Sequence, residues 1–219
     1  MPATMENGLA VVHLFCRPTE HLDRLAAIAA LGRASDSGVQ IVTAAILGHK
    51  ADVAVMALAP DFHPLRLMQT DLQRAGLEVI DSYVSITEVS EYAAGMPEHM
   101  LRSRLYPELP PEGLDTFCFY PMSKKREAHA NWYATPFDRR NDMMREHGTS
   151  GRTFAGRVVQ LVTGSTGLDD HEWGVTLFAT NPETVKDVVY TMRFDEGSAL
   201  YGEFGRFYLG YLVPVERLL

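Results

Sequence analysis

The sequence predicts an α+β fold built from two ferredoxin-like halves, and three observations support this class. Residues 39–84 have the pattern strand, strand, helix, strand, and residues 157–213 repeat the same order. A further helix is predicted over residues 21–34, which gives the first half the arrangement of a split β-α-β unit. We therefore expect two antiparallel sheets with helices on one face, and paired sheets of this kind can curve into a barrel.

The strands of the first half are predicted from short apolar runs. Residues 39–47 form a continuous apolar run, residues 51–58 alternate, and residues 77–84 resume the strand pattern after a helix. That helix begins after Pro60 and Asp61 and ends at Gly76. Its apolar residues recur at helical spacing and are Leu65, Met68, Leu72 and Ala75.

The second half repeats this order of elements. Strands are predicted over residues 157–164, 172–178 and 204–213. Asn181, followed by Pro182, is expected to begin the helix between the last two strands. The apolar residues of this helix are Val185, Val188, Val189 and Met192.

The predicted domain organisation follows from these two series. Residues 1–94 form the N-terminal half, residues 151–219 form the C-terminal half, and residues 95–150 connect them. The connecting segment carries many prolines, charges and aromatic residues without a strong period. A loop of this length in a compact domain is usually functional or disordered. Its aromatic residues and methionines argue against disorder, so we expect functional side chains there.

Composition and charge exclude several classes of protein. The chain has 219 residues and a formal net charge of -8 at pH 7, whereas nucleic-acid-binding proteins are more often basic. An acidic chain is also not drawn to anionic membranes in general. No run reaches the ~20 apolar residues of a membrane-spanning helix, and the first residues lack a signal-peptide pattern. Cys16 and Cys118 lie in apolar runs, which predicts buried thiols in a cytoplasmic protein.

A predicted helix over residues 136–148 places one histidine beside apolar side chains. Proline opens this helix and Gly148 closes it. Phe137, Arg140, Met144 and His147 fall on one face, with His147 in the last turn. One interpretation is a histidine favoured by the helix C-terminal dipole. The other is a metal or haem ligand, because a neutral imidazole is the usual proximal ligand of haem iron.

Tyr120 ends an apolar run and is followed closely by Lys124, Lys125 and Arg126. Lysine and arginine donate charge-assisted hydrogen bonds to carboxylates, so this pattern is consistent with a carboxylate pocket next to a tyrosine. The alternatives are a tyrosine that only packs and a basic run that only faces solvent.

Other polar residues stand in apolar or aromatic surroundings. They are His99, Arg104, Gln160, Arg193 and Ser198. A half-buried arginine generally needs an anionic partner, and Asp195 or Glu196 could serve Arg193 in that way. The sequence contains no cluster with zinc-ligand spacing and no glycine-rich phosphate loop.

Taken together, these motifs resemble the coproheme decarboxylases of the chlorite dismutase superfamily. The resembling segments are RLYP, CFYPMSKKR, NWY, HGTSGRTFAGRVVQLVTGSTGLDDHEWGVTLF, VVYTMRFDEGSA and EFGRFYLG. They cover the chain from about Tyr92 to Tyr211 and look closest to the actinobacterial branch. The first ninety residues agree with the family only in their order of strands and helices.

The resemblance implies a fold, an assembly and a reaction. The fold is a dimeric α+β barrel of the chlorite dismutase type, made of two ferredoxin-like halves, and the assembly is a homopentameric ring. The enzyme is an oxidoreductase of haem biosynthesis that uses hydrogen peroxide. It converts propionates 2 and 4 of iron-coproporphyrin III (coproheme) to vinyl groups, and the product is haem b. The iron porphyrin is substrate and redox centre together, and the ferrochelatase that supplies it is an expected transient partner.

The resemblance also implies roles for single residues. His147 is the proximal iron ligand, Tyr120 forms the radical that takes hydrogen from a propionate, and Lys124 holds the propionate that reacts second. The propionate sites are lined by Arg104, Met122, Arg193 and Ser198. The resemblance places Gln160 at the distal position, which is occupied by an arginine in true chlorite dismutases. His99 is the candidate distal base that deprotonates peroxide.

Two physical expectations accompany these roles. Cations close to Tyr120 should ease the loss of its phenolic proton. A His147 that is not paired with a strong carboxylate would stay a weak electron donor to iron, which suits an enzyme that must release its haem.

Three alternatives share parts of this pattern. A peroxidase or chlorite dismutase would use the same iron ligand with a different distal side, and Gln160 disfavours chlorite chemistry. A haem carrier without catalysis would need His147 but not Tyr120. A barrel that binds no porphyrin is the simplest alternative.

Overall fold

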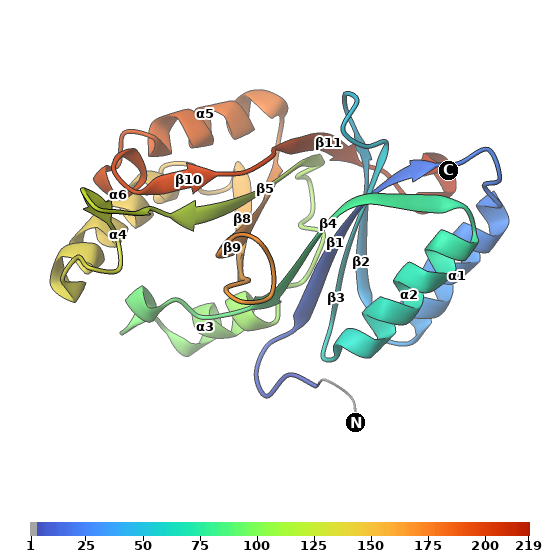
Figure 1. Cartoon of the computed structure of the whole chain (residues 1–219), viewed down its shortest axis with the longest axis horizontal. Helices are drawn as coiled ribbons and strands as arrows, with labels where there is room; N and C mark the ends of the chain where they lie inside the picture. Colours follow the sequence, from blue (N-terminus) through green and yellow to red (C-terminus); the bar gives the residue numbers. More distant parts are fainter. Residues whose placement is uncertain (1–3) are drawn as a thin grey trace.

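The computed structural model describes residues 4–219 as one closed β-barrel with helices outside it (Figure 1). Eight strands form the ring in the order β5-β11-β2-β3-β1-β4-β8-β9, and β9 pairs with β5 to close it. The predicted barrel of two ferredoxin-like halves is therefore confirmed, and a single chain supplies both halves. The barrel strands are β1 (Ala10–Pro18), β2 (Gln40–Ile46), β3 (Val53–Ala59), β4 (Leu77–Thr87), β5 (Thr116–Lys124), β8 (Val158–Gly164), β9 (Trp173–Ala179) and β11 (Tyr208–Leu212).

The first half consists of β1 to β4 with the helices α1 (Arg24–Asp36) and α2 (Phe62–Arg74). Asp23 and Asp61 cap the two helices, each accepting a hydrogen bond from a backbone N–H of the first turn. Gly76 follows α2 with φ +91, a conformation that favours glycine, and it turns the chain into β4. Alternate residues of β1 and β3 bury their side chains against α1 and α2, and the residues between them face the barrel core, which explains why β3 is apolar throughout.

The second half has the same topology, with β5, α4 (Phe137–Arg152), β8, β9, α5 (Pro182–Met192) and β11 in chain order. The elements β5 and α4 lie within residues 95–150 and complete this half. Asn181 caps α5 by accepting a hydrogen bond from the Thr184 backbone N–H at 2.8 Å. In Figure 1, α1 and α2 lie on one side of the molecule, and α4 and α5 on the other.

The two halves join at two short seams. β4 pairs with β8 at two positions, and β11 pairs with β2 at three. One apolar core fills the barrel and takes side chains from both halves, including Phe15, Met56, Phe117 and Phe178. The halves therefore share a single interior, while each keeps its own layer of helices outside.

Two boundaries differ from those predicted. The helix expected to end at Gly148 continues to Arg152, because Gly148 keeps helical backbone and does not turn the chain out of the helix. The strand expected over residues 204–213 is divided into β10 (Gly202–Phe204) and β11. Both pieces pair with β5, and the division falls at Gly205, where a side chain would collide with Pro121 and His171.

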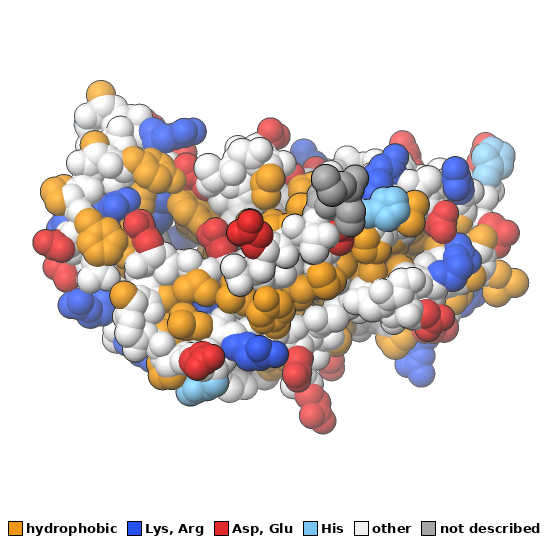
Figure 2. Space-filling view, turned by 90° about the horizontal axis from the view of Figure 1, so that it is seen from below, with side chains coloured by type: hydrophobic (Ala, Val, Ile, Leu, Met, Phe, Trp, Pro, Cys, Tyr) orange, Lys and Arg blue, Asp and Glu red, His pale blue; other side chains and the backbone are white. Residues whose placement is uncertain are grey.

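The remaining elements surround the second half. They are the short helix η1 (Glu91–Ala93), α3 (Glu98–Leu105), the paired strands β6 (Arg126–Glu127) and β7 (Ala130–Asn131), α6 (Glu196–Ala199) and α7 (Val215–Leu218). No helix within residues 4–219 is both long and apolar enough to span a bilayer. Figure 2 shows basic and acidic side chains interspersed on one face of the molecule, without a continuous basic surface on that face.

Candidate functional site

The outer face of β8, β9 and β5 brings several of the predicted residues into register. Tyr120 on β5 stands opposite Val175 on β9, which in turn stands opposite Val162 on β8. Side chains two residues apart along a strand share a face, so Met122 and Lys124 lie on the same face of β5 as Tyr120. This face is covered in part by α5 and carries its own apolar cluster.

Tyr120 lies at the centre of this face and is 6% exposed. Its ring stacks on Phe207, with 4.4 Å between the ring centroids, and meets Phe204 edge-on at 5.8 Å. Burial raises the pKa of the Tyr120 phenol well above its usual value. The prediction that neighbouring cations ease loss of its proton is therefore wrong, because desolvation dominates and keeps the phenol protonated at neutral pH.

Lys124 ends β5 and is buried, unlike most lysines. Its Nζ donates a hydrogen bond to the carbonyl of Gly197 at 2.6 Å and lies 4.6 Å from the ring centroid of Trp132. Burial lowers the pKa of Lys124 to about 8, and the nearby Glu172 carboxylate opposes that shift. Lys125 is half-buried and Arg126 is exposed in β6, so the basic run contains one buried cation.

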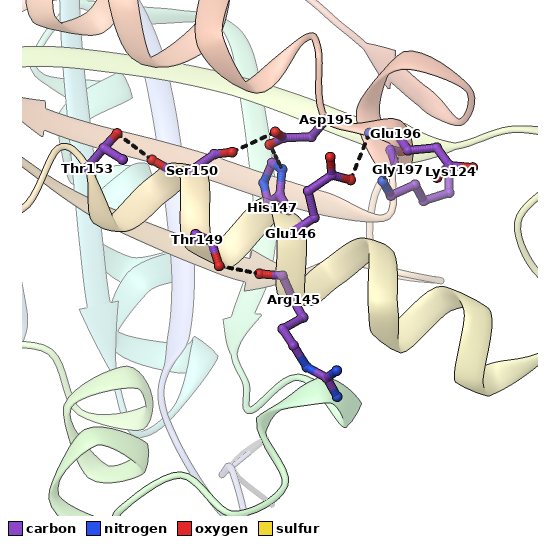
Figure 3. A network of polar contacts seen from close by, with 10 residues as sticks. All are labelled: Lys124, Arg145, Glu146, His147, Thr149, Ser150, Thr153, Asp195, Glu196 and Gly197. Carbon is purple, nitrogen blue, oxygen red and sulfur yellow. Dashed lines mark hydrogen bonds and ion pairs between the residues drawn. The ribbon is translucent and has the colours of Figure 1, made fainter.

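His147 projects from α4 toward α6, as Figure 3 shows. Its Nδ1 lies 2.9 Å from Oδ2 of Asp195, and the Ser150 hydroxyl donates to the other carboxylate oxygen of Asp195 at 2.6 Å. Two expectations are corrected here. Asp195 is the partner of His147 and not of Arg193, and the histidine is paired with a carboxylate, which makes it a stronger ligand.

These surroundings fit an iron porphyrin. Burial lowers the pKa of His147, with Asp195 acting in the opposite direction, so the neutral imidazole is favoured. Because Nδ1 is engaged by Asp195, Nε2 is the nitrogen left for a metal. An apolar sheet face, an oriented imidazole and a buried ammonium together suit a flat, apolar ring that carries iron and carboxylates. Within residues 4–219 there is no group of three or more His, Cys, Asp or Glu side chains placed to hold a metal ion.

The other predicted residues fall into three places. Ser198 lies in α6, beside the carbonyl that accepts from Lys124, and is half-buried. Gln160 lies exposed on β8, opposite Leu177 on the outer face of the barrel. Arg193 follows α5 and lines an open groove of about 350 Å³ between α5 and β11, which also includes Phe207.

His99 and Arg104 are both exposed on α3. Neither side chain makes a hydrogen bond or ion pair with another residue of the described chain. The structure therefore does not bring them into contact with Tyr120, Lys124 or His147.

Several residues of this site were missed from the sequence. Trp132 supplies the ring beneath Lys124, Glu172 accepts a hydrogen bond from the Lys124 backbone N–H at 2.8 Å, and Asp195 orients His147. Trp173 donates to Glu88 at 3.1 Å, and that carboxyl group occupies the space where a side chain at Gly164 would lie. These contacts join residues that are distant in sequence, so the sequence alone does not reveal them.

Comparison with known proteins gives consistent results. The family model described as chlorite dismutase matches residues 21–213. A protein of Staphylococcus carnosus named coproheme decarboxylase is 44% identical over 185 residues, covering 79% of this chain and 73% of that protein. The similarity thus extends into the first ninety residues, where only the order of elements was expected to agree.

Solved structures show the same fold. A heme-binding protein from Thermus thermophilus is 34% identical, with a TM-score of 0.86 over 100% of this chain and 97% of the other. A mutant chlorite dismutase from Candidatus Nitrospira defluvii aligns with a TM-score of 0.77 over 98% of this chain and 95% of the other. At 17% identity, that second likeness concerns the fold alone.

Proposed function

This chain belongs to the chlorite dismutase family, and from that premise we propose that it is a coproheme decarboxylase of haem biosynthesis. It converts propionates 2 and 4 of iron-coproporphyrin III to vinyl groups with hydrogen peroxide as oxidant, and haem b is the product. The observation that carries this proposal is the shared outer face of β5, where Tyr120 lies two strand positions from Met122 and four from the buried Lys124.

The residues of the site would hold the substrate by its iron and its carboxylates. Nε2 of His147 would bind the iron, with Asp195 holding the imidazole in orientation. Lys124 pairs with one propionate, and Met122, Ser198, Arg104 and Arg193 line the other propionate positions. These pairings would orient the substrate so that one propionate at a time meets the Tyr120 hydroxyl.

The reaction balances as one peroxide for each propionate. A hydrogen leaves the propionate carbon next to the ring, the carboxylate leaves as carbon dioxide, and a double bond forms between the two remaining carbons. This releases two electrons and one proton. Peroxide takes up these two electrons, that proton and one further proton from solvent to become two waters. The bound iron supplies the redox chemistry by which peroxide is reduced.

Tyr120 suits the transfer of a hydrogen atom better than the transfer of a proton alone. Its raised pKa keeps the phenolic hydrogen in place at neutral pH, so the proton and one electron leave the residue together. The stacked Phe207 keeps water away from the ring. The residue then recovers a hydrogen atom from the propionate carbon.

Gln160 and His99 complete the proposal on the distal side. Glutamine carries no charge to hold an anionic oxidant, which favours neutral peroxide over chlorite at this position. His99 acts as the base that takes a proton from peroxide, and its exposed position on α3 gives it access to solvent. A homopentamer is the expected assembly.

A peroxide titration of the protein bound to iron-coproporphyrin III, with mass spectrometry of the porphyrin, tests this function. We expect two successive losses, each of one carbon dioxide and two hydrogens, ending at the mass of haem b. Bleaching of the porphyrin without those losses would contradict the proposal and favour a carrier. Rapid release of oxygen from chlorite would favour a chlorite dismutase instead.

Binding of the porphyrin should weaken as the pH rises through about 8. The pKa of Lys124 is lowered from 10.5 to about 8, so above that pH the side chain is mostly neutral and no longer attracts a carboxylate. Lys124→Arg, which stays charged at every accessible pH, should remove this dependence. Affinity measured by absorbance titration between pH 6.5 and 9.5 checks the result, and a matching decline in both proteins would show that Lys124 is not the group responsible.

A further inference from the structure

A short segment, residues 205–207, joins β10 to β11 and lies against β5 beside Tyr120. The backbone N–H of Gly205 donates to the carbonyl of Pro121 at 2.8 Å, and a side chain at Gly205 would come within 2.7 Å of that proline. At the other end of this segment, the strap, the Phe207 ring stacks on Tyr120 with 4.4 Å between the centroids. The position of the strap therefore determines whether Phe207 covers Tyr120.

The first half of the chain anchors the strap at Phe207. Nζ of Lys50 donates a hydrogen bond to the Phe207 carbonyl at 2.6 Å. Lys50 lies in the turn between β2 and β3, 157 residues before Phe207, and is half-buried. An ammonium taken partly out of water needs an acceptor, and hydrogen bonds from a charged donor are stronger than neutral ones. This contact thus links a turn of the first half directly to the residue that covers Tyr120.

A second anchor from the first half follows immediately after Phe207. Tyr208 points into the barrel, where its ring stacks on Phe15 at 3.6 Å and its hydroxyl donates to Asp81. Asp81 on β4 also lies 3.6 Å from Nη1 of Arg206, but that guanidinium is exposed and such pairs contribute little. The chain on the C-terminal side of Phe207 is therefore fixed inside the barrel, which leaves the Lys50 hydrogen bond to fix Phe207 itself.

We propose that Lys50 is a positioning residue, which holds the Phe207 carbonyl and thereby keeps the Phe207 ring stacked on Tyr120. This inference rests on the role of Tyr120 in the proposed function. Transfer of a hydrogen atom requires the donor and the acceptor in a fixed orientation, and a small displacement of either slows the reaction strongly. A strap released from Lys50 lets Phe207 turn away, so the Tyr120 ring gains freedom and contact with water. Lys50 acts through Phe207 and not on the substrate itself.

Fluorine NMR of the porphyrin-free protein, with 3-fluorotyrosine in place of Tyr120, tests this position directly. The resonance should differ little between light and heavy water in the unaltered protein, because the ring is 6% exposed. In Lys50→Met we expect a shifted resonance and a larger difference between the two solvents. Lys50→Arg keeps a charged donor and should restore the original resonance. Lys186→Met is the matched control, because Lys186 is an exposed lysine on α5, and it should leave the resonance unchanged.

Kinetics with iron-coproporphyrin III and peroxide give a second readout. Lys50→Met should slow vinyl formation about 10-fold, as for loss of a hydrogen bond to a charged group, without changing the affinity for the porphyrin. Phe207→Leu removes the stacked ring itself and should change the fluorine resonance in the same way. In the Phe207→Leu background, Lys50→Met should slow the reaction no further, because a residue that acts through Phe207 then has no ring to position.

Three results would overturn the proposal. They are an unchanged fluorine resonance in Lys50→Met, no restoration by Lys50→Arg, and an additive loss of rate in the double variant. A lower melting temperature of Lys50→Met with an unchanged resonance would show that the contact only supports the fold. The resonance is recorded without porphyrin, so it tests the anchor even if peroxide yields no vinyl groups. Absence of vinyl formation by the unaltered protein would contradict the proposed function and not the anchor.

Discussion

Replacing Tyr120 with phenylalanine should lower the rate of vinyl formation by roughly 10²–10⁴-fold, the range seen when a group that transfers a proton is removed. Phenylalanine keeps the ring that stacks on Phe207 and removes only the hydroxyl, so the porphyrin should still bind with unchanged affinity. The measurement is mass spectrometry of the bound porphyrin after a fixed amount of peroxide. A normal yield of haem b from the variant would remove Tyr120 from the chemistry.

Tyr211→Phe is the matched control for this experiment. Tyr211 lies on β11, a neighbour of β5, and its side chain is 51% exposed. Loss of its hydroxyl should leave the yield of haem b and the affinity for the porphyrin unchanged. If both variants lose activity together, the effect belongs to the sheet and not to the Tyr120 hydroxyl.

Replacing His147 with alanine should weaken binding of iron-coproporphyrin III by about 100-fold or more, because loss of a metal ligand exceeds the 10–100-fold cost of losing a supporting partner. Metal-free coproporphyrin should bind to the variant as it does to the unaltered protein, since its carboxylates meet the same cations. Free imidazole added to the variant should restore part of the affinity for the iron form. Absorbance titrations with the two porphyrins measure both effects.

His129→Ala is a suitable control, because that side chain is 82% exposed. Its affinity for both porphyrins should match that of the unaltered protein. Equal weakening of the iron and metal-free porphyrins in His147→Ala would indicate damage to the fold around α4. It would contradict a role for His147 in holding iron.

Much of the fold could be predicted because local patterns determine it. β2, β3, α2 and α5 lie close to their predicted ranges, since their apolar residues recur with the period of a strand or a helix. The end of α4 could not be placed from the sequence. Glycine commonly ends a helix, but Gly148 keeps helical backbone in the folded chain. β1 was not identified as a strand, although residues 9–16 form an apolar run that is compatible with a strand.

The site was predictable to a smaller extent. Tyr120 and Lys124 share a strand and can be assigned to one face from their spacing alone. His147 reaches the same region only because α4 packs against α6, and its partner Asp195 lies 48 residues away. Contacts of this kind depend on tertiary packing, so the sequence indicated a ligand but not the carboxylate that orients it. The structure leaves His99 and Arg104 exposed on α3, and the roles expected of them stay predictions.

Closure of the barrel also bears on how the chain avoids aggregation. All eight ring strands have a neighbour on each side, but the seam between the halves is short: β4 pairs with β8 only at Ile86 and Thr87, so residues 77–85 have no strand partner on that side within residues 4–219. In the described chain, the outermost strand positions belong to β10, with three residues, and to the two-residue pieces β6 and β7. Val162, on the outer face of β8, is 40% exposed. An apolar, accessible sheet face favours strand pairing wherever a backbone edge is open, and closure of the ring confines such edges to the stretches beside the two seams.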